Sequence, residues 1–254
     1  MKRWRYVLLV LCTAVISISG TYLMTYFMRS EENKQEYEDI SQIGFPETEA
    51  DHEEENDQQD VKQSEDDFDY QSLVAINSDC VGWIQIPGTD INYPVVQAAD
   101  NEFYLTHNFN RETAACGAIF MDYRNDVDAK AEHLILYGHN MRTRSMFGSL
   151  HEFESEDFYK KYNKIYLYQP EKVMKYTVYS VYDCLDKSTT YLTDFTGDKK
   201  DNRWMDWLSM TIEKNAYYPI KKKPKKDGQI LTLSTCSGKK KGDDYRLVVN
   251  AVIK

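Results

Sequence analysis

An uncharged apolar segment near the N-terminus is the feature that most constrains what this chain can form. Residues 1–5 carry three basic side chains, residues 6–28 carry no charge, and Glu31 and Glu32 follow. About 20 apolar residues in a helix cross the hydrocarbon core of a bilayer. The charge pattern predicts a cytoplasmic N-terminus (1–5), a single transmembrane anchor (6–28) and an extracellular remainder. The alternative is a signal peptide cleaved near Ser17–Gly20, but the apolar run continues well past that site.

The segment after the anchor has the composition of a spacer. Eight of the fourteen residues from Glu47 to Asp60 are acidic, and almost none is apolar. Such a block cannot bury enough apolar surface to offset the entropy lost on ordering. We therefore expect an acidic disordered stalk over residues 29–67 and a folded domain over 68–254. The formal net charge of −10 argues against a nucleic-acid partner, which would require a basic surface.

Within residues 68–254, short apolar runs alternate with turn signals. The spacing of apolar residues predicts a short helix over Asp69–Asn77, a helical insertion over Ser145–Phe153 and an amphipathic helix over Lys199–Asn215. About eight short strands separated by turns predict a mostly β domain that closes into a barrel. The expected strands are Val81–Ile86, Ile91–Val96, Gly117–Met121, His133–Tyr137, Lys164–Tyr168, Val173–Tyr182, Ile230–Thr235 and Tyr245–Val252.

Cysteine usage bounds the chemistry of the domain. Outside the anchor the cysteines are Cys80, Cys116, Cys184 and Cys236, and no two of them form a C-x-x-C pair. This spacing argues against a zinc site, and we expect neither a metal nor another cofactor. The domain is large enough to hold a core without cross-links, so buried free thiols are expected at the first three, with two disulfides as the alternative.

Three residues at strand ends carry the expected chemistry. Cys236 ends an apolar strand, His139 follows another strand through Gly138, and Arg246 is a lone cation at the start of the last strand. Each of these features is by itself more often structural than catalytic. Together they match acyl transfer, in which a thiol attacks an amide carbonyl, a histidine protonates the leaving amine and a cation stabilises the oxyanion. No Asp or Glu is placed in the sequence to orient His139.

Two of these motifs resemble a known family. Thr232–Cys236 resembles the T-L-x-T-C signature of sortases, and Arg246 stands where their active-site arginine follows on the next strand. Leu136–Met141, followed by Ser145–Phe147, resembles the histidine region of class B sortases. From Asp69 to the C-terminus the chain is identified as a member of this class of cysteine transpeptidases of Gram-positive bacteria. Further matches are Trp83, Ile86–Thr89, Ile91, Tyr93–Gln97, Asp100, Asn101, Tyr104, Leu105, Gly117, Ile119, Phe120, Asp122, Arg124, Asn125 and Leu150.

The resemblance implies a fold and a two-step reaction. The fold would be an eight-stranded sortase barrel with an N-terminal helix and a long helix before the cysteine strand. Cys236 would cleave a C-terminal sorting signal of the Asn-Pro-x-Thr type after Thr, forming a thioester that a cell-wall amine resolves. His139 would protonate the leaving amine, and Arg246 with the backbone N–H of Ser237 would hold the oxyanion. The resemblance does not decide whether Cys236 and His139 rest as a thiolate–imidazolium pair or as a neutral pair.

The resemblance also implies a substrate groove and a location. The groove positions map onto Asn101, Tyr137, Tyr191, Leu192 and Ser234. Partners would be secreted proteins with sorting signals and a peptidoglycan amine, and the domain would face the cell wall from the cell membrane. One departure is Ser237, where many members of class B carry an acidic residue. The alternatives are a pilin-polymerising sortase that uses a lysine acceptor, a peptidase that only hydrolyses, and a non-catalytic surface-binding barrel.

Overall fold

The computed structural model describes residues 2–46, 67–126, 132–195, 200–219, 228–238 and 244–253. The chain divides into two units, residues 1–40 and 41–254. The first unit consists of helix α1 (Lys2–Gly44), which runs into the second. Large apolar side chains of α1 are exposed from Trp4 to Met28. By length and composition α1 could cross a membrane.

Part of the segment expected to be disordered is folded. Helix α1 continues to Gly44, and Phe45 packs edge-on against Trp83 and Tyr168, with ring centroids 5.5 and 5.1 Å apart. Residues 41–46, which fall within the segment expected to be disordered, therefore belong to the second unit. Composition could not show this, because the aromatic partners of Phe45 come from distant strands. Residues 47–66 of the expected stalk lie outside the described residues.

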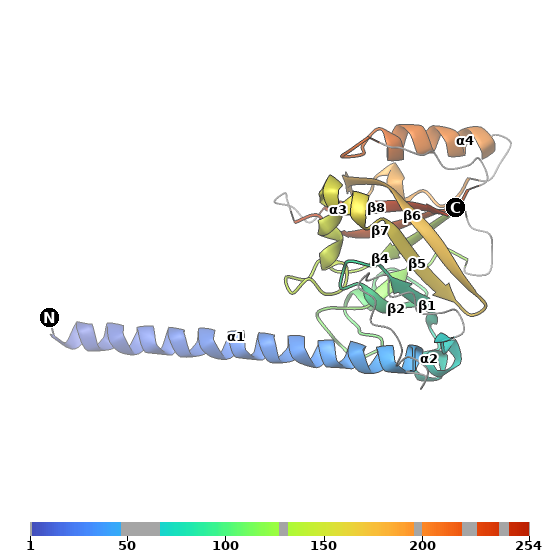
Figure 1. Cartoon of the computed structure of the whole chain (residues 1–254). Helices are drawn as coiled ribbons and strands as arrows, with labels where there is room; N and C mark the ends of the chain where they lie inside the picture. The colour runs from blue at the N-terminus through green and yellow to red at the C-terminus, as the bar shows by residue number, and fades with distance from the viewer. Residues whose placement is uncertain are drawn as a thin grey trace. The chain divides into compact units, whose positions relative to one another are not determined.

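Eight strands close into a barrel in the order β1-β2-β3-β4-β7-β8-β6-β5, which confirms the predicted fold class (Figure 1). Most neighbours are antiparallel, but β2 pairs with β3 and β4 with β7 in parallel. The strands are β1 (Cys80–Gln85), β2 (Asn92–Val96), β3 (Ile119–Met121), β4 (His133–Tyr137), β5 (Lys164–Gln169), β6 (Lys172–Leu185), β7 (Ile230–Cys236) and β8 (Tyr245–Ile253).

Strand β7 lies between β4 and β8 and carries the cysteine of interest. Its first six residues, Ile230 to Thr235, are buried, and Cys236 is its first exposed residue. A run buried on both faces is typical of a strand in a sheet whose two faces are both covered. The sequence thus changes from core to surface at Cys236.

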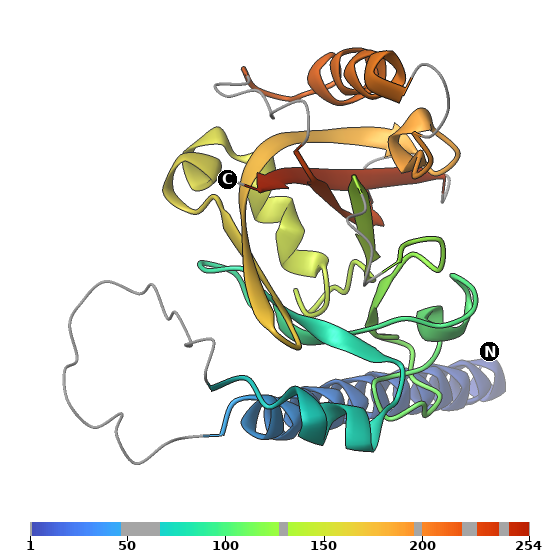
Figure 2. The same cartoon turned by 90° about the vertical axis from the view of Figure 1, so that its right-hand side faces the viewer.

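Helices cover the outside of the barrel. Helix α4 (Lys200–Trp207) continues as a π-helix η5 (Leu208–Glu213) and packs on β6 and β8, which confirms the long helix before the cysteine strand (Figure 2). Trp204 and Trp207 contact Phe195 in this layer. The remaining short helices are α2 (Tyr70–Ile76), α3 (Glu156–Lys161) and the 3-10 helices η2 (Phe103–Leu105), η3 (Gly148–Glu154) and η4 (Thr189–Tyr191).

Two smaller expectations, the helical insertion from Ser145 and the three buried free thiols, each differ from the structure in one respect. The insertion expected to be helical from Ser145 forms a 3-10 helix only from Gly148, because Met146 has a positive φ of 53° that a helix cannot contain. Cys80, Cys116 and Cys184 are free thiols, the first two buried and the third partly exposed.

Candidate active site

Cys236 and Arg246 are direct neighbours on the sheet. Cys236 is exposed at the end of β7 and lies opposite Arg246 on β8. Side chains directly opposite each other on antiparallel strands lie on the same face, with Cβ atoms about 5 Å apart. The guanidinium donates to the Tyr245 carbonyl oxygen at 3.3 Å and lies 4.0 Å from Asp186 Oδ2. The structure thus brings the expected nucleophile and the expected oxyanion partner together.

His139 follows β4 and reaches the same edge of the barrel. Its Nε2 lies 2.7 Å from the carbonyl oxygen of Leu105. A carbonyl only accepts hydrogen bonds, so Nε2 carries the proton in the neutral ring and Nδ1 is left with a lone pair. The next residue, Asn140, donates from Nδ2 to the backbone oxygen of Cys236 at 2.9 Å, which places the His139 turn beside the cysteine. Among the described residues no carboxylate bonds to His139.

Gly117 makes the close approach of Leu105 to His139 possible. Its φ is +58°, a conformation that favours glycine. A Cβ at this position would lie 2.4 Å from the Tyr104 carbonyl oxygen and 3.1 Å from His139 Cδ2. A larger residue would therefore push apart the two segments that hold the histidine.

The backbone amide of Ser237 is engaged elsewhere. Its N–H donates to the carbonyl oxygen of Tyr245 at 3.0 Å, within the β7–β8 edge. A single N–H has one hydrogen to donate, so in this conformation the amide does not face a substrate oxyanion. This differs from the expectation carried by the resemblance, and it leaves Arg246 as the expected oxyanion donor.

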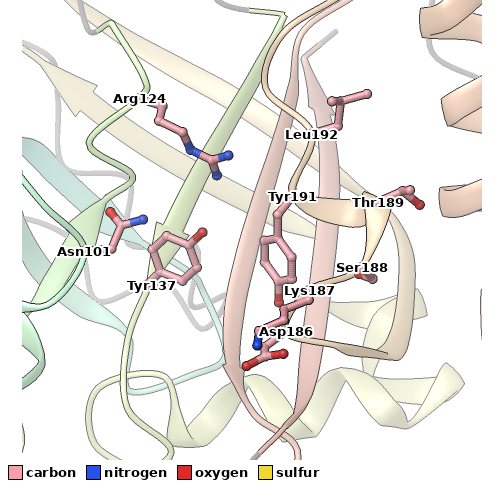
Figure 3. A pocket seen from close by; sticks show the side chains of 9 residues that line it. All are labelled: Asn101, Arg124, Tyr137, Asp186, Lys187, Ser188, Thr189, Tyr191 and Leu192. Atoms are coloured by element: carbon pink, nitrogen blue, oxygen red, sulfur yellow. The ribbon is translucent and has the colours of Figure 1, made fainter.

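A cavity of about 510 Å³ (Figure 3) has Asp186 in its lining, and the carboxylate of Asp186 lies 4.0 Å from the Arg246 guanidinium. Four of the five expected substrate-binding residues line it, namely Asn101, Tyr137, Tyr191 and Leu192. The fifth, Ser234, exchanges a hydrogen bond of 2.9 Å with the Tyr191 hydroxyl. The rings of Tyr137 and Tyr191 lie side by side, with centroids 6.1 Å apart. The other lining residues are Arg124, Asp186, Lys187, Ser188 and Thr189.

A buried carboxylate organises one wall of this cavity. Asp122 accepts hydrogen bonds from Arg124 Nη2 at 2.7 Å, the Tyr137 hydroxyl at 2.8 Å and Asn101 Nδ2 at 3.2 Å. Burial alone would raise the pKa of Asp122, but the bonds from Arg124 and Tyr137 outweigh it, and the pKa lies below its usual value. Burial raises the pKa of Tyr137, so its hydroxyl remains a neutral donor. The wall is therefore fixed in shape and charge.

A buried histidine holds the opposite wall. His133 is fully buried on β4, with Nδ1 2.7 Å from the Leu192 carbonyl oxygen and Nε2 2.7 Å from Thr232 Oγ1. Burial lowers the pKa of His133 to about 4. A carbonyl only accepts, so the neutral ring donates from Nδ1 to Leu192, while the Thr232 hydroxyl beside Nε2 gives its hydrogen to Asn250 Oδ1 at 2.7 Å. The segment at Leu192, which lines the cavity, is thus tied to strand β4 of the barrel.

This histidine predicts a dependence of stability on pH. The unfolded chain binds a proton at His133 below a pH of about 6.5, whereas the folded chain does so only near pH 4. The free energy of unfolding should therefore fall by about 3 kcal/mol from this residue alone as pH drops through that window. Denaturant unfolding of wild type and of His133→Gln at pH 7 and pH 4.5 isolates the contribution. Equal pH dependence in the two proteins would contradict the prediction.

Several site residues were not predicted as such from the sequence. Asp122 and Arg124 were noted only as matches to a family pattern, although a charged pair directly after an apolar strand is itself a signal. Gly117 likewise was noted only as a match. Residues 186–189 gave no signal, because a polar loop between strands looks the same whether it lines a cavity or faces solvent. No group of three or more His, Cys, Asp or Glu side chains in the described part of the chain is placed to hold a metal ion.

Comparisons with known proteins match the chain to one family. A family profile described as the sortase domain matches residues 84–254. Sortase B of Staphylococcus aureus is 30% identical over 253 residues, covering 100% of this chain and 98% of that protein. Sortase B of Listeria monocytogenes is 33% identical over 177 residues, 70% of each chain.

Solved structures show the same relationship. Sortase B from Bacillus anthracis in complex with AAEK1 matches with a TM-score of 0.72 at 33% identity, covering 89% of this chain and 98% of that one. A Staphylococcus aureus sortase B–substrate complex matches with a TM-score of 0.73 at 29% identity, with the same coverage.

Proposed function

The chain belongs to the sortase family of cysteine transpeptidases, within class B, and from this premise we propose that Cys236 cleaves a C-terminal sorting signal and passes the protein to an amine. The observation that carries the proposal is the position of Cys236. It is exposed at the end of β7, opposite Arg246 and tied to the His139 turn through Asn140. A thiol, a cation and an imidazole at one edge are what acyl transfer requires.

The first half-reaction follows from this arrangement. The Cys236 sulfur attacks the carbonyl carbon of the peptide bond after Thr, and the carbonyl oxygen takes up the negative charge. Arg246 holds that oxyanion, since its guanidinium is already oriented by Tyr245 and Asp186. Collapse of the intermediate breaks the C–N bond. His139 Nδ1, the nitrogen that Leu105 leaves free, first takes the proton of the Cys236 thiol and then gives it to the departing amine.

The second half-reaction reverses these roles. An acceptor amine attacks the thioester carbonyl, the oxyanion forms again beside Arg246, and His139 Nδ1 takes the proton that the amine loses. The C–S bond then breaks and Cys236 leaves as the thiolate. The products are a new amide and the regenerated enzyme, so no cofactor is needed to balance the reaction.

We assign the signal peptide to the cavity lined by Tyr137 and Tyr191, whose lining residue Asp186 lies 4.0 Å from Arg246. Its wall offers the second Asn101 amide hydrogen and the remaining N–H groups of Arg124 to peptide carbonyls, and the hydroxyl oxygens of Tyr137 and Tyr191 can accept from the N–H groups and polar side chains of an Asn-Pro-x-Thr segment. Ser234 stands two residues before the cysteine and bonds to Tyr191, which links the cavity to the nucleophile. The acceptor is a peptidoglycan amine in this proposal.

The proposed location uses helix α1. Residues 6–28 would span the cell membrane with the N-terminus inside, and the barrel would face the cell wall. Support comes from the apolar, exposed surface of α1 and from the basic residues that precede the span.

A peptide panel tests the proposed substrate. The full-length chain in detergent micelles is incubated with Asn-Pro-x-Thr peptides, peptides with the Asn or Thr replaced by Ala, and a scrambled control, with and without short amines. We expect cleavage after Thr in the first group, a weaker signal in the second, and amide products only with added amine. Equal cleavage of the scrambled peptide contradicts the assignment of the signal, and hydrolysis without any amide product contradicts transfer.

A further inference from the structure

The main chain of Cys236 is held by side chains from outside its strand. On β7 the carbonyl oxygen of Ser234 points toward β4 and accepts the Gly138 N–H at 3.2 Å, and the β4–β7 ladder ends there. Two residues further on, the carbonyl oxygen of Cys236 points the same way. It accepts from Asn140 Nδ2 at 2.9 Å and lies 3.2 Å from His151 Nε2. Asn140 and His151 therefore contact the β7 main chain at the point where a longer β4 would have continued the ladder.

His151 is itself fixed by a carboxylate. Its Nδ1 lies 2.6 Å from Glu154 Oε1, three residues later on η3, and its Nε2 lies 3.0 Å from Asn140 Nδ2. An ionised carboxylate only accepts, so Nδ1 carries a proton. In the neutral ring, Nε2 then accepts one hydrogen of the Asn140 amide, and the other hydrogen goes to the Cys236 carbonyl. In the protonated ring, Nε2 donates to that carbonyl directly, so both states of His151 hold it.

Holding this carbonyl fixes the peptide unit that follows the sulfur-bearing residue. The carbonyl of one residue and the N–H of the next lie in one plane. At the opposite edge of the same peptide unit, the Ser237 N–H donates to the Tyr245 carbonyl oxygen. Gly238 then turns the chain with a φ of +66°. The peptide is thus clamped from both sides at the point where the strand ends.

We propose that His151 and Glu154 are positioning residues for the nucleophile, acting through Asn140 on the Cys236–Ser237 peptide. They act on the main chain of Cys236, and through it on where the sulfur stands relative to Arg246. The kinetic part of this proposal rests on the proposed function, but the alignment of the thiol can be measured without any substrate.

Four variants of the full-length chain in detergent micelles test the proposal: His151→Leu, His151→Gln, Glu154→Gln and the control Glu152→Gln. Glu152 lies on the same 3-10 helix and pairs with Arg144 at 2.7 Å. We expect His151→Leu to lower kcat about tenfold with KM unchanged, because small displacements of a reacting group are costly. His151→Gln should restore most of the rate, since its amide can bond to Asn140 or the carbonyl. Glu154→Gln should be intermediate and Glu152→Gln like wild type.

A substrate-free readout separates the two proposals. Alkylation of Cys236 by iodoacetamide should be slowed about threefold in His151→Leu, because the sulfur is displaced from its cationic neighbour. If wild type cleaves no peptide, the proposed function fails while the alkylation rates still decide the positioning role.

Three outcomes overturn the positioning role. The first is a wild-type kcat together with a wild-type alkylation rate in His151→Leu. The second is a loss in His151→Gln as large as that in His151→Leu, and the third is that same loss in Glu152→Gln. Should His151→Leu not fold, wild-type rates in Glu154→Gln overturn it instead.

Discussion

Replacing Cys236 with alanine is expected to abolish cleavage of a sorting-signal peptide, with a loss of at least about 10⁴-fold, because loss of the nucleophile in acyl-transfer enzymes removes most of the catalysis. Cleavage is measured by chromatography of the peptide products from the full-length chain in detergent. Activity within tenfold of wild type would contradict the role of Cys236.

The same variant should leave the fold intact. Cys236 is exposed and stands at the end of its strand, so truncation to Ala should change the free energy of unfolding by no more than about 0.5 kcal/mol. Cys12 is the matched control, since it is the other exposed cysteine in the part of the chain that the structure describes. Cys12→Ala should cleave peptide like wild type. A large drop in melting temperature in Cys236→Ala would make loss of structure the cause of inactivity.

Replacing Arg246 with lysine is expected to lower kcat by about 10²-fold or more, the size of effect seen when an oxyanion donor is removed. Lysine keeps the positive charge, but it is a point charge on a flexible stem and does not reproduce the planar fork. Arg246 uses that fork, bonding to the Tyr245 carbonyl while lying 4.0 Å from Asp186. Steady-state kinetics with the sorting peptide measure the effect.

Arg111 provides a matched control for this substitution. It too is an arginine with a carboxylate partner, bonding to Asp79 at 2.8 Å with half of its side chain exposed. Arg111→Lys should keep wild-type kcat and KM. If Arg246→Lys also turns over at the wild-type rate, Arg246 does not hold the oxyanion, and the amide of Ser237 must leave Tyr245 to do so.

Local patterns in the sequence were enough to predict the eight strands of the fold. His133–Tyr137 was predicted with the bounds that the structure gives, and the other strands differ by a few residues at their ends. The order of strands around the barrel could not be predicted in this way. The parallel pairs β2–β3 and β4–β7 depend on which strands meet in space, and neither is a hairpin.

The chemistry of the site was partly predictable for the same reason. Cys236, His139 and Arg246 are side chains at strand ends, so their positions can be recognised in the sequence. The partner of His139 is the backbone oxygen of Leu105, and every residue has such an oxygen. His151 and Glu154 are an i, i+3 pair that the sequence displays, but their relation to Cys236 exists only once η3 has folded against the end of β7.

Trapping the acyl-enzyme tests the central claim most directly. The full-length chain in detergent is mixed with a sorting peptide, quenched in acid and analysed by intact mass and peptide mapping. We predict an added mass equal to the peptide up to Thr, located on Cys236, released by hydroxylamine and missing from Cys236→Ala. Cleavage products together with an adduct on another residue, or an adduct that persists in Cys236→Ala, would contradict the account.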